Sequence, residues 1–564
     1  MVDLMTKEGA ALLESGAQPW NIYPRPQMRR GNWVNLNGMW DFTVTQWEHL
    51  PESYDRTIRV PFCTESALSG IGAHFPEDSG LTYRKRVSLP AGFNRGRVLL
   101  HIGAADQISA VYVNRIFLGG TGGGYQASCY DITEALADEN EIIIQVRDDL
   151  TKTDLPYGKQ TLKRGGMWYT PVSGIWQSVW LESVPETYIE KLNIENRGAS
   201  VIISVEPALD GTVSVKDLGE FSLKNGSVTI TPEKPHFWSP EDPYLYDFTL
   251  TAGADRIESY FAIRTLEIKK VGKYQRLCLN GKPYFFHGLL DQGYWSDGLF
   301  TPADPACYAE DILAMKRLGF NTLRKHIKVE PEQFYYDCDR LGMVVFQDMV
   351  NNGPYDFFRD TALPTVGIQR LDDRRRHRDA RQREAFLKGM EATVRQLHNH
   401  PGICYWTIFN EGWGQFDSTA AYRRLRALDD TRWIDSTSGW FRCGESDVES
   451  LHIYFKALKF KKSEKPLVLS EFGGYSCKIA EHAFNPDRTY GYGKFTERGA
   501  FVDALTRLYR EQVAPAVEQG LCAAIYTQVS DVEDETNGLL TYDRRVCKVR
   551  PEELCPLADL LRLE

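Results

Sequence analysis

Residues 403–414 read ICYWTIFNEGWG, and this stretch decides how the C-terminal half of the chain is interpreted. Seven mostly apolar residues run directly into Asn410 and Glu411, and glycines follow. A short apolar run of this length is typical of a strand that is buried on both faces. Because the run ends where the polar residues begin, we expect Asn410 and Glu411 at the C-terminal end of that strand.

Residues 466–474 read PLVLSEFGG and repeat the pattern, with Glu471 at the end of an apolar run and two glycines close behind it. Either glutamate alone could be a solvated residue at a strand end. Two carboxylates at the ends of two buried parallel strands, however, can face each other across one pocket. Such a pair is what cleavage of a glycosidic bond requires, with one carboxyl group as the acid and the other on the opposite face of the sugar.

The bulk composition excludes several classes of partner. A chain of 564 residues is long enough for two to four domains. Its net charge of −10 argues against nucleic acid or an anionic membrane as the main partner. No apolar run is long enough for a transmembrane helix, and the N-terminus lacks the pattern of a signal peptide. The eleven cysteines show no metal-binding spacing, so we expect reduced thiols in a cytoplasmic protein.

The spacing of the apolar residues changes character along the chain. Short strand-like runs separated by turn residues come first and predict β-sandwiches. Strand and helix signals then alternate through eight strands, which predicts a (β/α)8 barrel. The predicted domains are a jelly-roll, sugar-binding-like domain at 1–185, an immunoglobulin-like sandwich at 186–270 and a catalytic TIM barrel at 271–564.

In a barrel of this kind the active site forms at the C-terminal ends of the strands. Nearly every predicted strand ends in a polar or ionisable side chain, which indicates a polar pocket around the glutamate pair. These residues are His287, Arg324, His326, Asp348, Asn410, Glu411, Asp435, His452, Tyr454, Glu471, Thr527 and Gln528.

The chain resembles glycoside hydrolase family 2, which includes β-galactosidases, β-glucuronidases and β-mannosidases. The resemblance depends most on Asn-Glu-Gly at 410–412 and Ser-Glu-Phe-Gly-Gly at 470–474, each after a predicted buried strand. The order of the predicted domains agrees with it, and it extends over almost the whole chain. Further matching motifs are Asn-Leu-Asn-Gly-Met-Trp at 35–40, Val-Ser-Gly-Ile-Trp at 172–176, Asn-Gly-Lys-Pro at 280–283, Arg-Lys-His at 324–326 and Asp-Arg-Leu-Gly-Met at 339–343.

This resemblance implies a role for each site residue. Glu411 is the expected general acid/base, Glu471 the expected nucleophile, and Asn410 the expected contact of the sugar 2-hydroxyl group. Tyr454 resembles a tyrosine that hydrogen-bonds the nucleophile, and Arg324 resembles an arginine beside it, although it could instead form an ion pair in a barrel layer. The other predicted substrate-binding residues are His326 and His452, which could also be core histidines, together with Asp348, Trp440 and, as a stacking ring, Tyr526.

The chain also departs from the family in ways that bear on the substrate. The Asn-x-Lys signature of typical β-glucuronidases is not evident at 537–539, and the histidine of the magnesium site in large β-galactosidases has no clear counterpart after Asp348. We therefore expect no metal and no cofactor. Where some relatives place a sugar-binding aspartate in the first domain, this chain has Gly165 and Gly166.

The predicted loop at 349–379 is rich in arginine. Its arginines could be a solvated basic run, or one of them could reach the pocket and bind a sugar carboxylate, which guanidinium does well. Arg544 and Arg545 are further candidates for that cation. The arginines of the loop are Arg370, Arg374, Arg375, Arg376 and Arg378.

The sequence therefore predicts a retaining, exo-acting β-glycoside hydrolase that works by double displacement on a small carbohydrate or glycoside, with a homo-oligomer as a possible assembly. We expect a galacto-configured sugar, in a β-galactoside or a β-galacturonide. The alternatives are a β-glucuronidase or other β-hexuronidase, and a β-glucosidase or β-mannosidase. Two rivals of other classes are a non-catalytic carbohydrate-binding protein and a transglycosidase.

Overall fold

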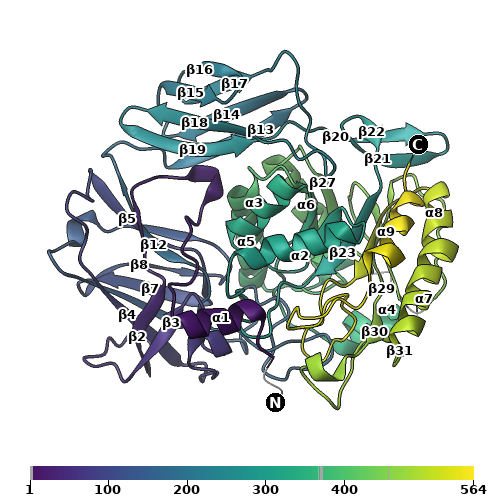
Figure 1. The fold of residues 1–564 in the computed structure, drawn as a ribbon, viewed down its shortest axis with the longest axis horizontal. Coiled ribbons are helices and arrows are strands. Elements are labelled where there is room, and N and C mark those ends of the chain that lie inside the picture. Colours follow the sequence, from purple (N-terminus) through teal and green to yellow (C-terminus); the bar gives the residue numbers. More distant parts are fainter. Residues whose placement is uncertain (1–3, 366, 369–371, 455, 564) are drawn as a thin grey trace.

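The computed structural model describes residues 4–365, 367–368, 372–454 and 456–563, and it shows two antiparallel β-sandwiches followed by a barrel of parallel strands (Figure 1). In Figure 1 the first sandwich is purple and blue, the second is teal and lies above it, and the barrel occupies the other side of the molecule. The predicted fold class is confirmed. Among the described residues, no helix is long and apolar enough to cross a membrane; the expected cytoplasmic location stays a prediction.

The first sandwich has a six-stranded sheet in the order β3-β2-β4-β10-β7-β8 and a four-stranded sheet in the order β1-β12-β5-β9. Alternate residues of its strands point inward, so Trp40 and Phe42 of β2 and Tyr83 of β4 lie in the core between the sheets. Its strands are β1 Trp33–Asn35, β2 Gly38–Gln46, β3 Arg56–Val60, β4 Ser79–Val87, β5 Arg97–Ile102, β6 Ala105–Asp106, β7 Ile108–Val113, β8 Ile116–Gly122, β9 Ser128–Asp131, β10 Asn140–Arg147, β11 Gly174–Ile175 and β12 Val179–Val184.

The second sandwich is smaller and packs a three-stranded sheet, β13-β14-β17, against a four-stranded sheet, β16-β15-β18-β19. Val201 and Ile203 of β14 face Phe248 and Leu250 of β18 in its core. A short three-stranded ribbon, β20-β21-β22, leads into the barrel. The strands are β13 Lys191–Arg197, β14 Ser200–Glu206, β15 Gly211–Val215, β16 Gly219–Leu223, β17 Ser227–Ile230, β18 Tyr246–Ala252, β19 Asp255–Phe261, β20 Leu266–Val271, β21 Tyr274–Leu279 and β22 Lys282–Pro283.

The barrel is one eight-stranded sheet in the order β27-β26-β25-β24-β23-β32-β29-β28, and its strand pairs are parallel. The two ends of this sheet meet, because the hydroxyl groups of Ser438 in β27 and Ser450 in β28 lie 3.2 Å apart. All eight predicted strands are therefore present. They are β23 Phe286–Asp291, β24 Thr322–Lys325, β25 Val344–Asp348, β26 Ile403–Asn410, β27 Trp433–Ser438, β28 Glu449–Ile453, β29 Leu467–Gly473 and β32 Leu521–Thr527.

Helices cover the outside of the barrel. The side chain of Asp417 caps the helix at 418–428 by accepting from the Ala420 N–H. A π-helical turn at Tyr509–Val513 separates the helices at 498–508 and 514–518. The helices are α1 Lys7–Ser15, α2 Ala306–Arg317, α3 Glu332–Leu341, α4 Leu363–Thr365, α5 Ala380–Leu397, α6 Ser418–Leu428, α7 Arg498–Leu508, α8 Ala514–Glu518 and α9 Pro551–Asp559.

Two predicted strand-end residues lie deeper in the barrel than expected. β23 continues to Asp291, so His287 lies inside the strand, where its Nδ1 is 3.0 Å from the carbonyl oxygen of Gly319. β27 continues to Ser438, so Asp435 is also internal. Short apolar runs mark the middle of a strand well but do not show where its pairing stops.

The first sandwich docks on the barrel through shared apolar packing. Tyr125 and Trp176 belong to the same buried cluster as Phe300, and the rings of Trp176 and Phe300 have centroids 5.0 Å apart. After β10, the backbone N–H of Tyr157 donates to Asn351 of the barrel at 3.1 Å. These contacts hold the segment 157–169 of the first sandwich at the mouth of the barrel, the rim where the C-terminal ends of its strands lie.

Candidate active site

Glu411 stands where β26 ends and the chain turns away from the sheet. Its backbone has a φ of +51°, a left-handed conformation that costs a non-glycine residue about 1 kcal/mol or more. Two features hold it there: the N–H of Glu411 donates to the Ser438 carbonyl of the next strand at 3.0 Å, and Gly412 follows with a φ of +78°. This turn lifts the carboxyl group out of the strand and into the mouth.

Glu471 lies near the end of β29, and the two glycines behind it are required by what packs over them. Gly473 has a φ of +78°, and a Cβ there would lie 2.3 Å from the ring of Tyr526. Gly474 has a φ of +65°, and a Cβ there would lie 2.6 Å from the ring of Tyr492. The Glu-Phe-Gly-Gly motif thus lets aromatic rings close around the strand end.

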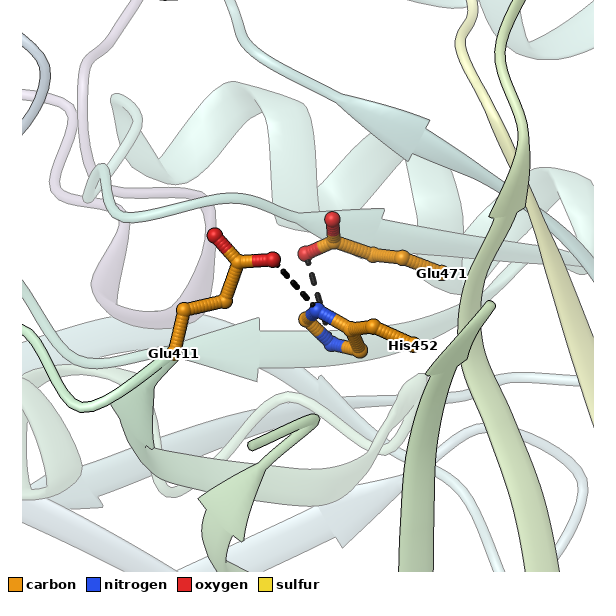
Figure 2. A group of neighbouring side chains, drawn as sticks. All are labelled: Glu411, His452 and Glu471. Carbon is orange, nitrogen blue, oxygen red and sulfur yellow. Dashed lines mark hydrogen bonds and ion pairs between the residues drawn. The ribbon is translucent and has the colours of Figure 1, made fainter. Parts of the chain in front are cut away.

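The two carboxylates lie across one narrow space, with His452 between them (Figure 2). Nδ1 of His452 is 2.8 Å from Oε1 of Glu411, and its Nε2 is 3.6 Å from Oε1 of Glu471. One oxygen of each carboxylate and a ring nitrogen all lie within 4.8 Å of one another. Gly439 makes room for this ring, because a Cβ there would be 2.5 Å from it.

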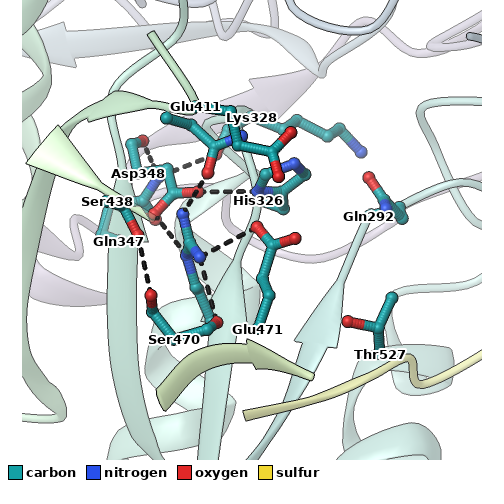
Figure 3. A network of polar contacts seen from close by, with 12 residues as sticks. Gln292, His326, Lys328, Gln347, Asp348, Glu411, Ser438, Ser470, Glu471 and Thr527 are labelled. Atoms are coloured by element: carbon teal, nitrogen blue, oxygen red, sulfur yellow. Dashed lines mark hydrogen bonds and ion pairs between the residues drawn. The ribbon is translucent and has the colours of Figure 1, made fainter. Parts of the chain in front are cut away.

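Arg324 connects several residues of the site, and Figure 3 shows two of its partners, Asp348 and Glu471, in one polar network. Its Nε donates to Asp348 at 3.0 Å, one terminal nitrogen donates to Glu471 at 3.0 Å, and the other donates to Oδ1 of Asn410 at 2.8 Å. It also donates to the Ser470 carbonyl at 3.0 Å. The guanidinium therefore holds three site residues in place. They are Glu471, the candidate nucleophile, Asn410, which precedes the candidate acid, and Asp348.

Burial and neighbouring charges shift the pKa values of Glu471 and His326. Burial alone would raise the pKa of Glu471, but His452, Arg324 and a hydrogen bond from the Tyr454 hydroxyl outweigh it and lower this pKa to about 2. Burial lowers the pKa of His326 to about 4, despite its contact of 2.8 Å with Asp348. Glu471 is therefore a carboxylate, and His326 is neutral, at neutral pH.

Asn410 is left with one free hydrogen-bonding atom. Because arginine can only donate, its contact with Arg324 identifies the amide oxygen of Asn410. The amide nitrogen Nδ2 is buried and has no acceptor among the described residues. A buried donor without a partner is costly, so this group is oriented to donate to a bound molecule.

Three predicted substrate-binding residues are buried behind the two glutamates or beside a barrel strand, and a fourth lies next to His452. Tyr526 is wrong as a stacking ring: it is completely buried, and its ring packs against Phe472 on the outside of β32. Arg324 and Asp348 are about 1% exposed and hold other site residues, so they position the site and do not line it. Trp440 is half-buried, with its ring edge-on to His452 at 6.4 Å.

Residues that the sequence did not identify pack around the site. Tyr492 stacks on Tyr454, with ring centroids 4.1 Å apart. Trp168 of the first sandwich packs against Trp413, with ring centroids 5.2 Å apart. Lys159 of the same sandwich lies over the Trp413 ring, with its Nζ 5.0 Å from the centroid. The only available signal was Trp413 in the opening motif, because contacts across domains leave no local pattern in the sequence.

Most of the described arginines in the loop at 349–379 fit the simpler prediction, a solvated basic run. Arg374, Arg375 and Arg378 are exposed, and Arg370 lies outside the described residues. Arg376 is largely buried beside Gly412 but is paired with Asp360 at 2.6 Å.

The two other candidate cations are also engaged away from the carboxylates. Arg544 pairs with Asp311 at 3.3 Å and stacks on Trp295, and Arg545 donates to the Met5 carbonyl at 2.9 Å.

Glu411, His452 and Glu471 also have the spacing of a metal site. Their atoms are already engaged, since His452 contacts Glu411 while Arg324 and Tyr454 donate to Glu471. A cation between them would have to lie next to the Arg324 guanidinium, which is unfavourable. This donor set therefore suits acid–base chemistry better than metal binding, and we continue to expect no metal.

Comparison with known proteins gives matches over most of the chain. Residues 270–545 match the description "Glycosyl hydrolases family 2, TIM barrel domain", and residues 187–264 match "Glycosyl hydrolases family 2". A β-glucuronidase of Bacteroides fragilis is 24% identical over 72% of this chain and 61% of its own length. A β-galactosidase of Thermoanaerobacter pseudethanolicus is 26% identical over 54% of this chain and 45% of its own length.

A solved structure shares the whole architecture. The β-D-glucuronidase of Dictyoglomus thermophilum superposes with a TM-score of 0.73 at 18% identity, covering 95% of this chain and 98% of its own. At that identity the likeness shows the fold, including the order of the two sandwiches and the barrel.

The double glycine behind Glu471 predicts a stability effect. We expect Gly473→Ala to lower the free energy of unfolding by about 2–4 kcal/mol, because the new Cβ adds a clash with Tyr526 to the left-handed backbone strain. Gly272→Ala is the matched control: its φ is +58°, but no atom lies within 4 Å of its Cβ, so it should cost only about 1 kcal/mol. Denaturant unfolding of both variants measures the difference, and equal losses would contradict the packing argument.

Proposed function

The chain belongs to glycoside hydrolase family 2, and from this membership we propose that it is a retaining, exo-acting β-glycoside hydrolase. The observation that carries the proposal is the pair of buried carboxylates, Glu411 and Glu471, with oxygens within 4.8 Å of each other. Retaining glycosidases hold their two carboxyl groups about 5 Å apart, whereas inverting enzymes leave room between them for a water molecule.

In the first step, Glu471 attacks the anomeric carbon and the bond from that carbon to the aglycone oxygen breaks. Glu471 is suited to this role because it is ionised and its oxygens are held by Arg324 and Tyr454. Glu411 transfers its proton to the leaving oxygen as the bond breaks, which releases the aglycone as an alcohol. The product of the step is an ester between the sugar and Glu471.

In the second step, Glu411 takes a proton from water, and the oxygen of that water attacks the same carbon. The ester bond breaks, Glu471 leaves as a carboxylate, and the sugar is released with its original β configuration. Asn410 contributes in both steps, because its unpaired Nδ2 is available to donate to the sugar 2-hydroxyl group. Hydrogen bonds at this position strengthen in the transition state.

The burial of both carboxylates favours action on a terminal sugar. Glu411 and Glu471 are 6% and 4% exposed, and the Tyr454 hydroxyl donates to Glu471 while its ring stacks on Tyr492. We therefore retain the exo-acting mode and a small glycoside as the substrate.

For the released sugar we propose a β-hexuronide, with β-glucuronide as the first candidate. The support comes from the Bacteroides relative and the Dictyoglomus structure, both named as β-glucuronidases. They favour this alternative over the galacto-configured sugar that we expected from the sequence. A β-galactoside is the second candidate, since the Thermoanaerobacter relative is named as a β-galactosidase. The possible homo-oligomer stays a prediction.

Azide rescue tests the two glutamates. We expect Glu471→Gly to form an α-glycosyl azide from an activated β-glycoside, by a single displacement in the space that the missing carboxylate leaves. Glu411→Gly should form the β-glycosyl azide, because azide then attacks the ester on Glu471. NMR analysis of the products distinguishes the two, and the opposite stereochemistry would exchange the roles.

The pH profile tests the dependence of Glu471 on Arg324. Arg324→Met removes a charge that lowers the pKa of Glu471, so this pKa should rise and the nucleophile should become protonated at a higher pH. The acid limb of kcat/KM should therefore move upward by about one to three pH units. Arg374→Met, at an exposed position of the arginine-rich loop, should leave the limb in place. A lower rate with an unmoved limb would refute the argument.

The released sugar is tested by kcat/KM for 4-nitrophenyl β-D-glucuronide, β-D-galacturonide, β-D-glucoside and β-D-galactoside. We expect the glucuronide to exceed both neutral glycosides by about a hundredfold or more, which corresponds to about 2.7 kcal/mol. Galactoside as the best substrate would overturn the uronide assignment and support the second candidate.

A further inference from the structure

Lys159 is a buried cation that the first sandwich supplies to the mouth of the barrel. It is 7% exposed. Two hydrogen bonds fix the backbone around Lys159. The Tyr157 hydroxyl donates to the Gly353 carbonyl of the barrel at 2.8 Å, and the Tyr169 N–H donates to the Lys159 carbonyl at 3.0 Å. The side chain therefore reaches the mouth from a segment that is itself tied to the barrel.

The surroundings of the ammonium group place it on the nucleophile side of the site. Nζ lies 5.0 Å from the centroid of the Trp413 ring and 5.8 Å from that of Tyr169. Trp413 in turn packs edge-on to His326, which stands just beyond the end of β24. Lys159 and Glu471 both act electrostatically on Glu535, in the segment after β32, so these three charges share one region.

Lys159 differs from every other buried lysine that the structure describes. Lys325 pairs with Asp291 at 2.6 Å, Lys328 pairs with Glu330 at 2.9 Å, and Lys548 pairs with Asp531 at 2.6 Å. Within the described part of the chain, the Nζ of Lys159 has neither a hydrogen-bond acceptor nor an ion-pair partner, only the two aromatic rings. An ammonium group that contacts two aromatic rings and no carboxylate is available to an anionic or strongly accepting ligand.

We propose that Lys159, from the first sandwich, binds the carboxylate of the uronic sugar. The inference rests on the β-hexuronidase function proposed above and names a residue that determines its specificity. The pocket offers other donors without acceptors among the described residues, namely Nδ2 of Asn410 and Nε1 of Trp413. A pocket rich in donors suits a ligand that carries a carboxylate and several hydroxyl groups.

Glu535 is an acidic neighbour of Lys159, and its charge affects whether a sugar carboxylate can bind there. Burial raises its pKa, and the effect of Lys159 and a hydrogen bond from the Tyr169 hydroxyl do not cancel that rise. Burial of Glu535 thus favours its neutral form, which repels a sugar carboxylate less than the charged form does. The competing explanation is that Lys159 serves only to balance Glu535, although the two do not form an ion pair in the structure.

The experiment compares Lys159→Met, Lys159→Arg and the wild-type enzyme on 4-nitrophenyl β-D-glucuronide and β-D-glucoside. Lys159→Met keeps the length of the side chain and removes its charge. We expect it to reduce kcat/KM for the glucuronide roughly tenfold to a hundredfold and to change the glucoside value by less than about threefold. Lys159→Arg should restore part of the glucuronide activity. Lys163→Met is the matched control, because Lys163 is exposed in the same segment.

The outcomes separate this inference from the function on which it rests. A wild-type enzyme that prefers the glucoside would overturn both. A wild-type preference for the glucuronide that survives in Lys159→Met would overturn only the role of Lys159. Equal losses on both substrates would mean that Lys159 balances Glu535 and does not select the carboxylate. Competitive inhibition by free D-glucuronate, weakened in Lys159→Met while inhibition by D-glucose is unchanged, would support the inference independently of turnover.

Discussion

The guanidinium of Arg324 is the constraint on which the rest of the site depends. It is almost completely buried, and burial would lower its pKa, but Asp348 and Glu471 outweigh burial and raise it above the ordinary value. The acidic partners therefore stabilise this buried charge. The same guanidinium holds the amide of Asn410, so one buried cation orients the proposed nucleophile and the proposed sugar contact together.

Around that centre, the mouth is shaped by backbone conformations that few residues can adopt. Glu411 is held in a left-handed conformation by a hydrogen bond to the neighbouring strand, and Gly439 and Gly473 lie where a Cβ would strike a ring. The backbone is therefore strained at these strand ends, and hydrogen bonds across the sheet hold it in the strained conformation. The first sandwich contributes Trp168 and Lys159, whose side chains lie against the ring of Trp413 in the barrel.

Much of the barrel could be predicted from the sequence, because a strand buried on both faces leaves a continuous apolar run. The runs before Glu411 and Glu471 are of this kind, and both glutamates lie where these runs predicted them. Tyr526 shows what an apolar run does not reveal, namely which face of the strand a side chain lies on. Ile525 packs inside the barrel and Tyr526 packs outside it, against the helices, and in a fully apolar strand no alternation of polar residues reveals which face is which.

The sequence by itself determined the fold class, the eight barrel strands and the two glutamates, since each of these leaves a local signal of hydrophobicity and turn residues. Only the tertiary structure decided that His452 stands between the carboxylates, that Arg324 and Asp348 lie behind them, and that Lys159 of the first sandwich lies over the Trp413 ring. Those facts depend on side chains that are far apart in the chain, and on how two separately folded domains dock. The free energy of such contacts is a property of the packed interface and leaves no pattern in either segment alone.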